Sequence, residues 1–419
     1  MRLGIFITLM LATLHVTYAT EVIHQESITL KQVIDNVLEK NPQIGINNYE
    51  NKAAAARTRQ AQQTSPLRLK AELENFVGTG SYKNIDQMET TLSLIKILES
   101  DNALTSRSDL ARQQARQLLT EQDRKQLDLL TQAAEQFIHV VVDQHRLEIA
   151  KDYLRLVQRT YKIVSRRVKA GKSHVAEQRR FAINESRAEI ELEHAEHELS
   201  TSRLKLTANW GETQPLFGVA EANLFDLPQI QSFETLAELI KNNPDLVRFA
   251  NAERISQARL RLARSRRAAN FELSAGISYF NEQDDAALAF SVSMPFGSRS
   301  QAQPKIDEMN SLSQLDPLMY EQQRILLYTS LYEIYQELSH ARTAYKVLNN
   351  KIIPEAQNAA NDYEQGYKTG RFSLLELNEA QQILLDARLE AVMAAAKYHR
   401  LKIEIERLTG SALQIGEKK

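Results

Sequence analysis

The chain repeats itself: landmarks in its first half return in the same order in its second half. The paired landmarks are Asn41-Pro42 with Asn243-Pro244, Lys169 with Lys368, Gly171 with Gly370, and Trp210-Gly211 with Thr409-Gly410. The spacing from Gly171 to Gly211 equals that from Gly370 to Gly410, and matches in the same order indicate a duplicated structural unit. We therefore expect two copies, at 20–211 and 233–410, joined by a Pro- and Phe-richer segment at 212–232 and followed by a short tail at 411–419.

Both copies have the same layout of expected elements. The pattern predicts helical stretches at 28–65 and 233–268, very long helical stretches at 101–168 and 304–367, and return helices at 173–209 and 372–409. Gly and Pro are scarce, 13 and 9 residues in 419, which favours long helices. About 68 residues of helix would reach roughly 100 Å, typical of a coiled-coil bundle rather than a globular domain. Pro317 and Pro354 are expected to kink or break the second long stretch.

Four segments alternate between apolar and polar residues with the period of a β-strand. They lie at about 67–77, 88–97, 270–280 and 287–296. Each is long enough to cross a bilayer as a tilted strand, with apolar residues toward lipid. Four strands cannot close a barrel or satisfy their edges in lipid. Either they form two hairpins of a soluble sheet, or several chains share one barrel; the long helices and the N-terminus favour sharing.

The N-terminus has the pattern of a secretory signal peptide, expected at 1–19. Arg2 precedes an apolar stretch at 3–14, and Thr17-Tyr18-Ala19 offers small residues for cleavage. A membrane anchor is the alternative, but about a dozen apolar residues are too few to span a ~30 Å hydrocarbon core.

Composition narrows the classes of function. The net charge of -1 lacks the basic excess of a nucleic-acid-binding protein, and the chain has no cysteine for a disulfide or thiolate site. Nucleophile-elbow, zinc-protease and phosphate-binding-loop motifs are absent, so no enzyme, catalytic residue or cofactor is predicted. His194 and His197 have a spacing that can bind a transition metal, but a charged, solvated helix face is the more common role of such a run, so no metal site is predicted.

Several longer motifs carry a family resemblance. They are "ELENFVGTG" from Glu72, "RRVKAGKSHVAEQRRF" from Arg166, "MPFGSRSQAQ" from Met294 and "YKTGRFSLLELNEAQQILLDARLEA" from Tyr367. With the repeat, they cover nearly the whole mature chain. The chain resembles the TolC family of outer membrane factors, and within it the heavy-metal branch that works with cobalt-zinc-cadmium and copper-silver resistance pumps.

The resemblance implies a mostly α fold with a small β part, assembled as a homotrimer. Three chains would share a 12-stranded β-barrel in outer membrane lipid and extend an α-helical tunnel into the periplasm. The implied function is passive efflux, with heavy-metal cations expected, fed by an inner-membrane resistance-nodulation-division pump through a periplasmic adaptor protein. A type I secretion or drug-export duct of the same family, or a periplasmic coiled-coil scaffold without a pore, remain alternatives.

Two turn motifs, "KAGKS" at 169–173 and "KTGRFS" at 368–373, are expected at the helix-turn-helix tips. Glycine provides the positive φ of the turn, and Ser173 and Ser373 are expected as N-caps of the return helices. The resemblance implies that these tips dock the adaptor, although a helical hairpin needs the same residues whatever binds it. The expected docking residues are Lys169, Gly171, Lys172, Ser173, Lys368, Gly370, Arg371 and Ser373.

Charged residues just beyond the tips are candidates for a periplasmic gate. Glu376 and Glu379 share a helix face and match positions where the family often carries aspartates around the closed entrance. The repeat places Glu177 and Arg180 at the equivalent positions. We hypothesise that Arg180 and Glu379 alternate around the entrance of a trimer and latch it; solvated helix charges without a latch are the alternative.

Overall fold

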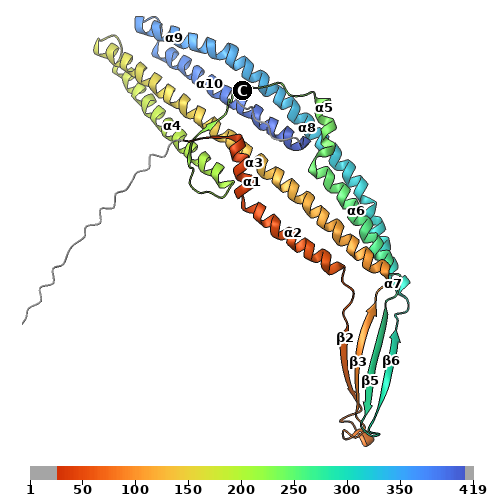
Figure 1. Ribbon diagram of the computed structural model, residues 1–419. Helices are drawn as coiled ribbons and strands as arrows, with labels where there is room; N and C mark the ends of the chain where they lie inside the picture. The colour runs from red at the N-terminus through yellow and green to blue at the C-terminus, as the bar shows by residue number, and fades with distance from the viewer. Residues whose placement is uncertain (1–25, 411–419) are drawn as a thin grey trace, which may run out of the picture.

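The chain folds into a long body with a β-sheet at one end and two helical hairpin tips at the other (Figure 1). The computed structural model describes residues 26–410. The expected signal peptide at 1–19 and the tail at 411–419 therefore lie outside the described residues. The expectation of a mostly helical chain with a small β part is confirmed.

The elements follow the repeat. The first copy contains β1 (Glu26–Thr29), α1 (Leu30–Lys40), α2 (Pro42–Ala61), β2 (Arg68–Glu74), β3 (Glu89–Leu98), α3 (Asp101–Lys169) and α4 (Val175–Ala208). The second copy and the joining segment contain β4 (Phe217–Glu221), α5 (Phe233–Leu239), α6 (Pro244–Ser265), β5 (Phe271–Phe280), β6 (Asp285–Ser293), α7 (Ser298–Ser313), α8 (Leu315–Val347), α9 (Ile353–Thr369) and α10 (Leu374–Thr409).

Four strands form one antiparallel sheet in the order β2-β3-β5-β6. The central pairing of β3 with β5 joins the two copies, with Leu92 opposite Ile277. The first strand ends at Glu74, three residues before the expected end, because Asn75 and Val77 have positive φ values of 58° and 56° and cannot continue an extended strand. A second, two-stranded sheet pairs β1 with β4 in parallel near the middle of the molecule.

The two long helical stretches differ in continuity. α3 is one helix of 69 residues, which gives a length of about 100 Å. Its counterpart is divided into α7, α8 and α9, with a π-helical segment at Leu348–Ile352. Proline lacks the N–H that would bond the carbonyl four residues earlier. Pro317 accounts in this way for the end of α7 at Ser313. Pro354 accounts for the π-helical segment that precedes it in the chain. Both interruptions lie at the prolines expected from the sequence to kink or break this stretch.

The repeated Asn-Pro pairs have the same structural role in both copies. Asn41 Oδ1 accepts a hydrogen bond from Gln43 N at 2.8 Å, and its amide nitrogen donates to the Asn209 carbonyl at the end of α4. Asn243 does the same with Asp245 N and with the Leu408 carbonyl of α10, at 2.7 and 2.9 Å. Each asparagine thus caps one helix and fixes the end of a return helix against it.

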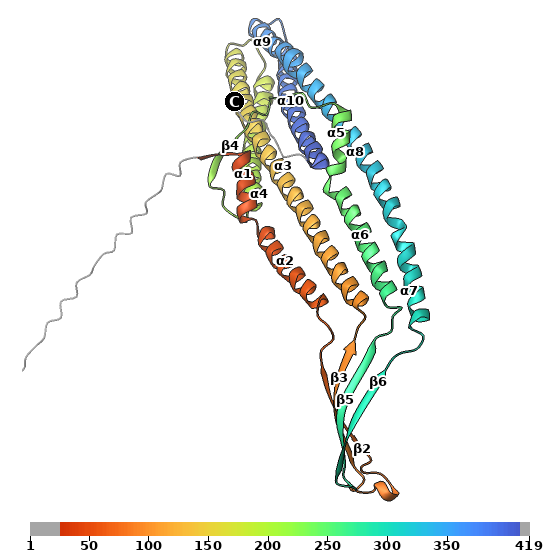
Figure 2. The ribbon, with the colours of Figure 1, turned by 45° about the vertical axis from the view of Figure 1, so that its right-hand side comes forward.

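The main apolar core lies in the middle of the helical body. It includes Phe137, Ile138 and Val141 of α3, packed with Val33 of α1 and Ile403 of α10. The views in Figures 1 and 2 show α2, α3, α6 and α7–α8 running from this region toward the sheet, and the α3–α4 and α9–α10 hairpins running away from it. Across residues 26–410 no helix has the length and apolar character needed to span a membrane.

Candidate functional site

The four-stranded sheet has two chemically different faces. One face carries exposed, mainly aliphatic and aromatic side chains: Leu69, Leu73, Leu92, Leu94, Leu273, Ile277, Tyr279, Leu288, Phe290 and Val292. The cross-strand register aligns them in rows, for example Leu69, Leu94, Ala275 and Phe290. An apolar patch this exposed in a single chain indicates contact with a membrane or with another protein.

The opposite face is mostly polar or small, and its polar groups pair with one another. Arg68 of β2 pairs with Glu272 of β5 at 2.9 Å, across the intervening β3. The Thr91 and Ser278 hydroxyls lie 2.7 Å apart. Gly276 also faces this side, where a Cβ would lie 2.6 Å from the Leu92 carbonyl oxygen. The alternation expected from the sequence is thus realised as one apolar and one polar face.

Both edges of this sheet are open within the described chain. β2 bonds only to β3, and β6 only to β5. Because every neighbouring pair is antiparallel, β6 runs opposite to β2. Two open edges of opposite direction can continue the antiparallel pattern with β2 and β6 of other copies.

The two helix tips have the same turn geometry, as the repeat predicts. Gly171 and Gly370 have φ values of 69° and 84°, in the left-handed region that favours glycine. The following amides reach back to the last helical turn: Lys172 N donates to the Arg167 carbonyl at 2.9 Å, and Arg371 N to the Gly366 carbonyl at 2.8 Å. These bonds satisfy carbonyls that a helix C-terminus leaves unpaired.

The expected N-cap is right at one tip and wrong at the other. Ser373 caps α10, and the Glu376 carboxylate accepts a hydrogen bond from Ser373 N at 2.8 Å, which completes a capping box. At the first tip the cap of α4 is His174, whose Nδ1 accepts from Ala176 N at 3.0 Å. Aligning the turn glycines makes His174, not Ser173, the counterpart of Ser373; Ser173 lies one residue too early.

Arg167 joins the two tips, which sequence patterns did not indicate. Its guanidinium donates to the Tyr367 and Lys368 carbonyls at 2.8 and 3.0 Å, and within its own tip to the Lys172 carbonyl at 3.3 Å and Ser173 Oγ at 3.1 Å. It also lies 4.8 Å from the centre of the Tyr367 ring. Ser173 therefore serves as a partner of Arg167 instead of as a helix cap.

Contacts of Phe372 and Glu364 also order the second tip. A Cβ on Gly366 would lie 2.1 Å from Phe372 Cδ2, so only glycine lets this ring cross the end of α9. The Phe372 ring packs against Tyr363, with ring centres 4.6 Å apart. Glu364 is largely buried and pairs with Arg159 of α3 at 3.0 Å and with Lys368 at 2.7 Å. The Arg159–Glu364 pair, 205 positions apart in the chain, thus joins the two hairpins.

The four candidate gate residues have different surroundings. Hydrogen bonds from the Ser373 backbone and side chain lower the pKa of Glu376, which favours its charged form. Glu177 Oε2 accepts a hydrogen bond from the Tyr367 hydroxyl at 3.0 Å. Arg180 and Glu379 are both exposed, and no ion pair joins them within residues 26–410.

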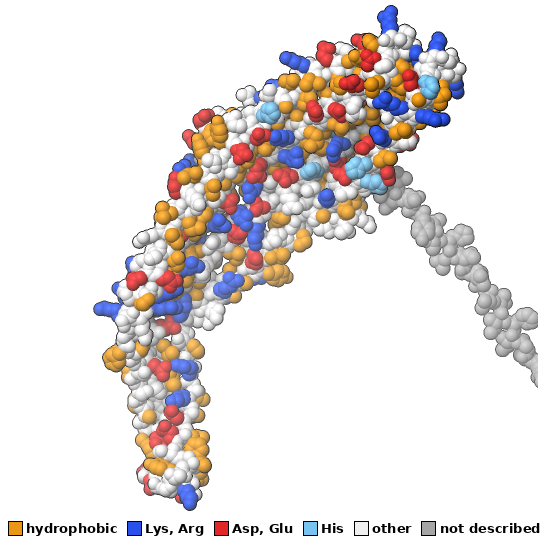
Figure 3. All heavy atoms as spheres, turned by 180° about the vertical axis from the view of Figure 1, so that it is seen from behind, with side chains coloured by type: hydrophobic (Ala, Val, Ile, Leu, Met, Phe, Trp, Pro, Cys, Tyr) orange, Lys and Arg blue, Asp and Glu red, His pale blue; other side chains and the backbone are white. Residues whose placement is uncertain are grey.

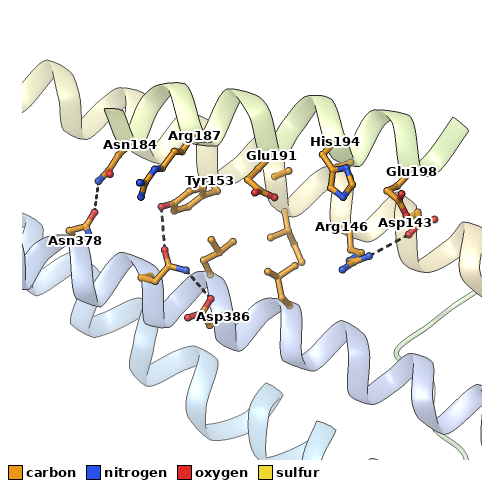
Figure 4. Close-up of a pocket in the computed structure, with 17 residues that line it drawn as sticks. Asp143, Arg146, Tyr153, Asn184, Arg187, Glu191, His194, Glu198, Asn378 and Asp386 are labelled. Carbon is orange, nitrogen blue, oxygen red and sulfur yellow. Dashed lines mark hydrogen bonds and ion pairs between the residues drawn. The ribbon is translucent and has the colours of Figure 1, made fainter. Parts of the chain in front are cut away.

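A groove runs between α4 of the first hairpin and α10 of the second (Figure 4). It encloses about 440 Å³ between α3, α4 and α10. Asn184 of α4 bridges to Asn378 of α10 at 2.7 Å near one end, and Asp143 and Arg146 of α3 lie near the other. Burial raises the pKa of the Asp143 carboxyl and lowers that of the neighbouring His139 imidazole.

The paired histidines of α4 do not come together as metal ligands. His194 faces the groove (Figure 4), whereas His197 lies 3.2 Å from Glu193 on an exposed surface. No cluster of three or more ligand-type residues suited to a metal ion occurs in the part of the chain that the structure describes.

A sheet with one apolar face, placed at the end of a helical body of this length, defines a membrane channel protein with a long helical extension. The "Outer membrane efflux protein" family matches residues 33–212 and 235–411. The chain therefore belongs to the outer membrane efflux protein family. It is an outer-membrane transport duct of an efflux system and not an enzyme.

Individual relatives agree with this assignment. The chain is 28% identical over 288 residues to the cobalt-zinc-cadmium resistance protein CzcC of Cupriavidus metallidurans, an alignment that covers 68% of each chain. Among solved structures, CusC aligns with a TM-score of 0.72 at 18% identity, covering 91% of this chain and 92% of CusC. VceC of Vibrio cholerae aligns with a TM-score of 0.72 at 14% identity, covering 92% of this chain and 97% of VceC.

Proposed function

We propose that three copies of the chain assemble into the passive exit duct of a tripartite efflux system that discharges heavy-metal cations. The observation that carries this proposal is the four-stranded sheet with one apolar face, one polar face and two open edges. Backbone groups at a lipid-exposed edge must be paired, so the sheet has to close with others into a barrel. Three sheets of four strands give twelve strands, an even number compatible with an antiparallel barrel.

The helical body supports a conduit that continues on one side of the membrane. α3 alone runs for about 100 Å from the sheet to the tip. α2, α6 and α7–α8 run beside α3 near the sheet, and the α3–α4 and α9–α10 hairpins continue beyond it, so three copies meeting around an axis can line a tunnel.

The proposed substrate comes from the comparison with CzcC, which is named for cobalt, zinc and cadmium resistance. The structure offers no dedicated metal site in residues 26–410. A duct without such sites would conduct passively, with selection and energy supplied by an inner-membrane pump.

We also propose the two tips as the docking surface for a periplasmic adaptor. They lie at the far end of the helical body from the sheet, the end nearest a pump. Lys172 and Arg371 are exposed beside equivalent turn glycines and offer two similar cationic contacts per chain. The remaining residues of this surface are Lys169, Gly171, Ser173, Lys368, Gly370 and Ser373.

The gate hypothesis remains part of the proposal, because Arg180 and Glu379 are exposed without pairing to each other in the chain. Around a three-fold axis, Arg180 of one copy would face Glu379 of another, with Glu177 and Glu376 behind them. Arg180→Glu would replace attraction by repulsion and raise single-channel conductance. Arg155→Glu, on an exposed part of α3 away from the tips, is the control. Equal conductance of wild type and Arg180→Glu would rule out the latch.

The decisive test is planar-bilayer conductance of the purified protein, combined with metal sensitivity of a deletion strain. We expect a detergent-dependent trimer that conducts, and a deletion strain sensitive to cobalt, zinc or cadmium. Lys172→Glu with Arg371→Glu should keep the conductance but fail to restore metal tolerance, whereas Lys241→Glu should restore it. A monomer that is freely soluble without detergent and does not conduct would refute the duct.

A further inference from the structure

We propose that a basic collar where the helices meet the sheet binds the phosphate headgroups of anionic phospholipids. The collar consists of Arg266, Arg267 and Arg299. Arg266 and Arg267 lie between the end of α6 and the start of β5, and Arg299 is the second residue of α7, which follows β6. Figure 3 shows Lys and Arg side chains at this level of the molecule.

The collar arginines are exposed and lack carboxylate partners within the described chain. Arg267 donates to the neutral amide oxygen of Gln303 at 2.6 Å, and Arg266 and Arg299 have no ion pair in residues 26–410. Farther along α6, by comparison, Arg261 pairs with Asp109 at 2.5 Å. At the sheet–helix junction the three arginines therefore present positive charge that no carboxylate of the described chain neutralises.

Helix stability explains only part of this charge. Arg266 is at the C-cap of α6, where a cation interacts favourably with the helix dipole. Arg299 lies in the first turn of α7, where the same dipole disfavours a cation and no acidic residue compensates. Its charge is better accounted for by an anion outside the chain.

The neighbouring apolar residues identify that anion's source as a lipid surface. Phe296 is 87% exposed and Phe271 is 45% exposed, and both lie at the junction beside the arginines. They continue the apolar face of the sheet up to the collar. Aromatic rings followed by basic residues are the arrangement found where a membrane protein leaves the hydrocarbon and enters the headgroup layer.

This inference rests on the proposed membrane placement of the sheet and specifies which lipids meet its helix-side rim. A basic residue at an anionic membrane surface strengthens association by roughly fivefold. Three such residues per chain, repeated in a trimer, would enrich phospholipids with a net negative headgroup over zwitterionic ones with the same acyl chains.

The test is native mass spectrometry of the full-length protein in detergent micelles doped with phosphatidylglycerol or phosphatidylethanolamine of matched acyl chains. The wild type should retain phosphatidylglycerol at least about tenfold better. Arg266→Gln, Arg267→Gln and Arg299→Gln together should abolish that preference, and the three Arg→Lys changes should keep it. The charge-matched control, with Lys31, Lys205 and Lys241 changed to Gln in the middle of the body, should also keep it.

Three outcomes would overturn the collar. The first is an unchanged lipid preference in the Arg→Gln variant. The second is displacement of phosphatidylglycerol by inorganic phosphate at equal concentration, which would indicate a simple anion site. The third is loss of the trimer with lipid preference intact in the remaining monomers, which would indicate ion pairs between copies. Conductance of the Arg→Gln variant separates the two proposals, because a conducting trimer without lipid preference refutes the collar alone.

Discussion

Arg167 shows how one side chain can fix the relation between two hairpins. All the hydrogen bonds it makes end on atoms of the two tips, and the Tyr367 ring lies against its guanidinium. The contacts with Tyr367 and Lys368 join positions about 200 residues apart, so they act on tertiary structure rather than on either helix alone.

We expect Arg167→Met to loosen the tips without unfolding the chain, because hydrogen bonds from a charged group contribute about 1.5–3 kcal/mol each. Hydrogen exchange of the amides around residues 366–373 should become faster, while that of the Phe137 region should not change. Arg166→Met is the matched control, since Arg166 is exposed and bonds only to a carbonyl of its own helix. Equal protection of the tips in wild type and Arg167→Met would contradict this role.

His399 makes the stability of the fold depend on pH. It is 3% exposed, its Nε2 donates to the Leu224 carbonyl at 2.9 Å, and its buried Nδ1 has no partner among the described residues. Burial lowers its pKa below the ordinary 6.5. Below that pH the unfolded chain takes up a proton that the folded chain does not, so the free energy of unfolding decreases as pH falls.

The melting temperature should therefore decrease as the pH falls from about 7.5 to about 5.5. For each such histidine, the free energy of unfolding decreases by up to about 1.4 kcal/mol per pH unit. His399→Gln should flatten this dependence in part, since burial also lowers the pKa of His139 and His145. The exposed His197 is the control, and His197→Gln should leave the slope unchanged. A slope that His399→Gln does not alter would exclude this histidine as the cause.

At the scale of single elements, β6 tests the two-faced sheet most directly. Phe290 is 77% exposed on the apolar face, and the next residue, Ser291, belongs to the polar face. The same substitution at these two neighbouring positions therefore compares a side chain on the proposed lipid-facing side with one on the proposed lumen-facing side.

Phe290→Arg should destabilise the membrane-inserted protein by about 2–4 kcal/mol, the typical effect of a cation near the bilayer midplane. Ser291→Arg should have little effect. Urea unfolding in lipid micelles measures the difference, and the yield of trimer from outer membranes gives a second readout. Similar losses for both variants would argue against a lipid-facing side.

At the scale of the whole molecule, the proposed assembly can be tested with engineered disulfides. The chain has no cysteine of its own that could form a competing bond. Lys70 on β2 and Ala289 on β6 lie in one row of the sheet but are separated by β3 and β5. Within a chain this is about 14 Å, too far for a disulfide, which needs Cα atoms closer than about 7 Å.

A chain with Lys70→Cys and one cysteine at 287, 289 or 291 should form covalent trimers when oxidised, because β6 of one copy would pair with β2 of the next. At least one of the three registers should give bands of two and three chains on a non-reducing gel. Each single-cysteine variant is the control and should stay uncrosslinked through the barrel edges. Monomers throughout, or a ladder beyond three chains, would contradict closure by three copies.

The sequence alone determined features that depend on residues a few positions apart. α3 begins at Asp101 as the pattern predicted and ends at Lys169, one residue beyond the expected 168, because no glycine or proline interrupts it. The strand alternation, the turn glycines and the Ser373 cap are of the same local kind. The end of α7 before Pro317 also follows from proline geometry.

Only the tertiary structure decided how these parts meet. The antiparallel pairing of β3 with β5, the Arg167 bridge, and the Arg159–Glu364 pair depend on segments far apart in the chain. The shift of the α4 cap from Ser173 to His174 was missed because two serines looked equivalent when the turns were compared by residue type rather than by position. Periodicity reports which face of an element is buried, but partners across the fold are chosen by packing and hydrogen-bond geometry, which a single sequence does not display.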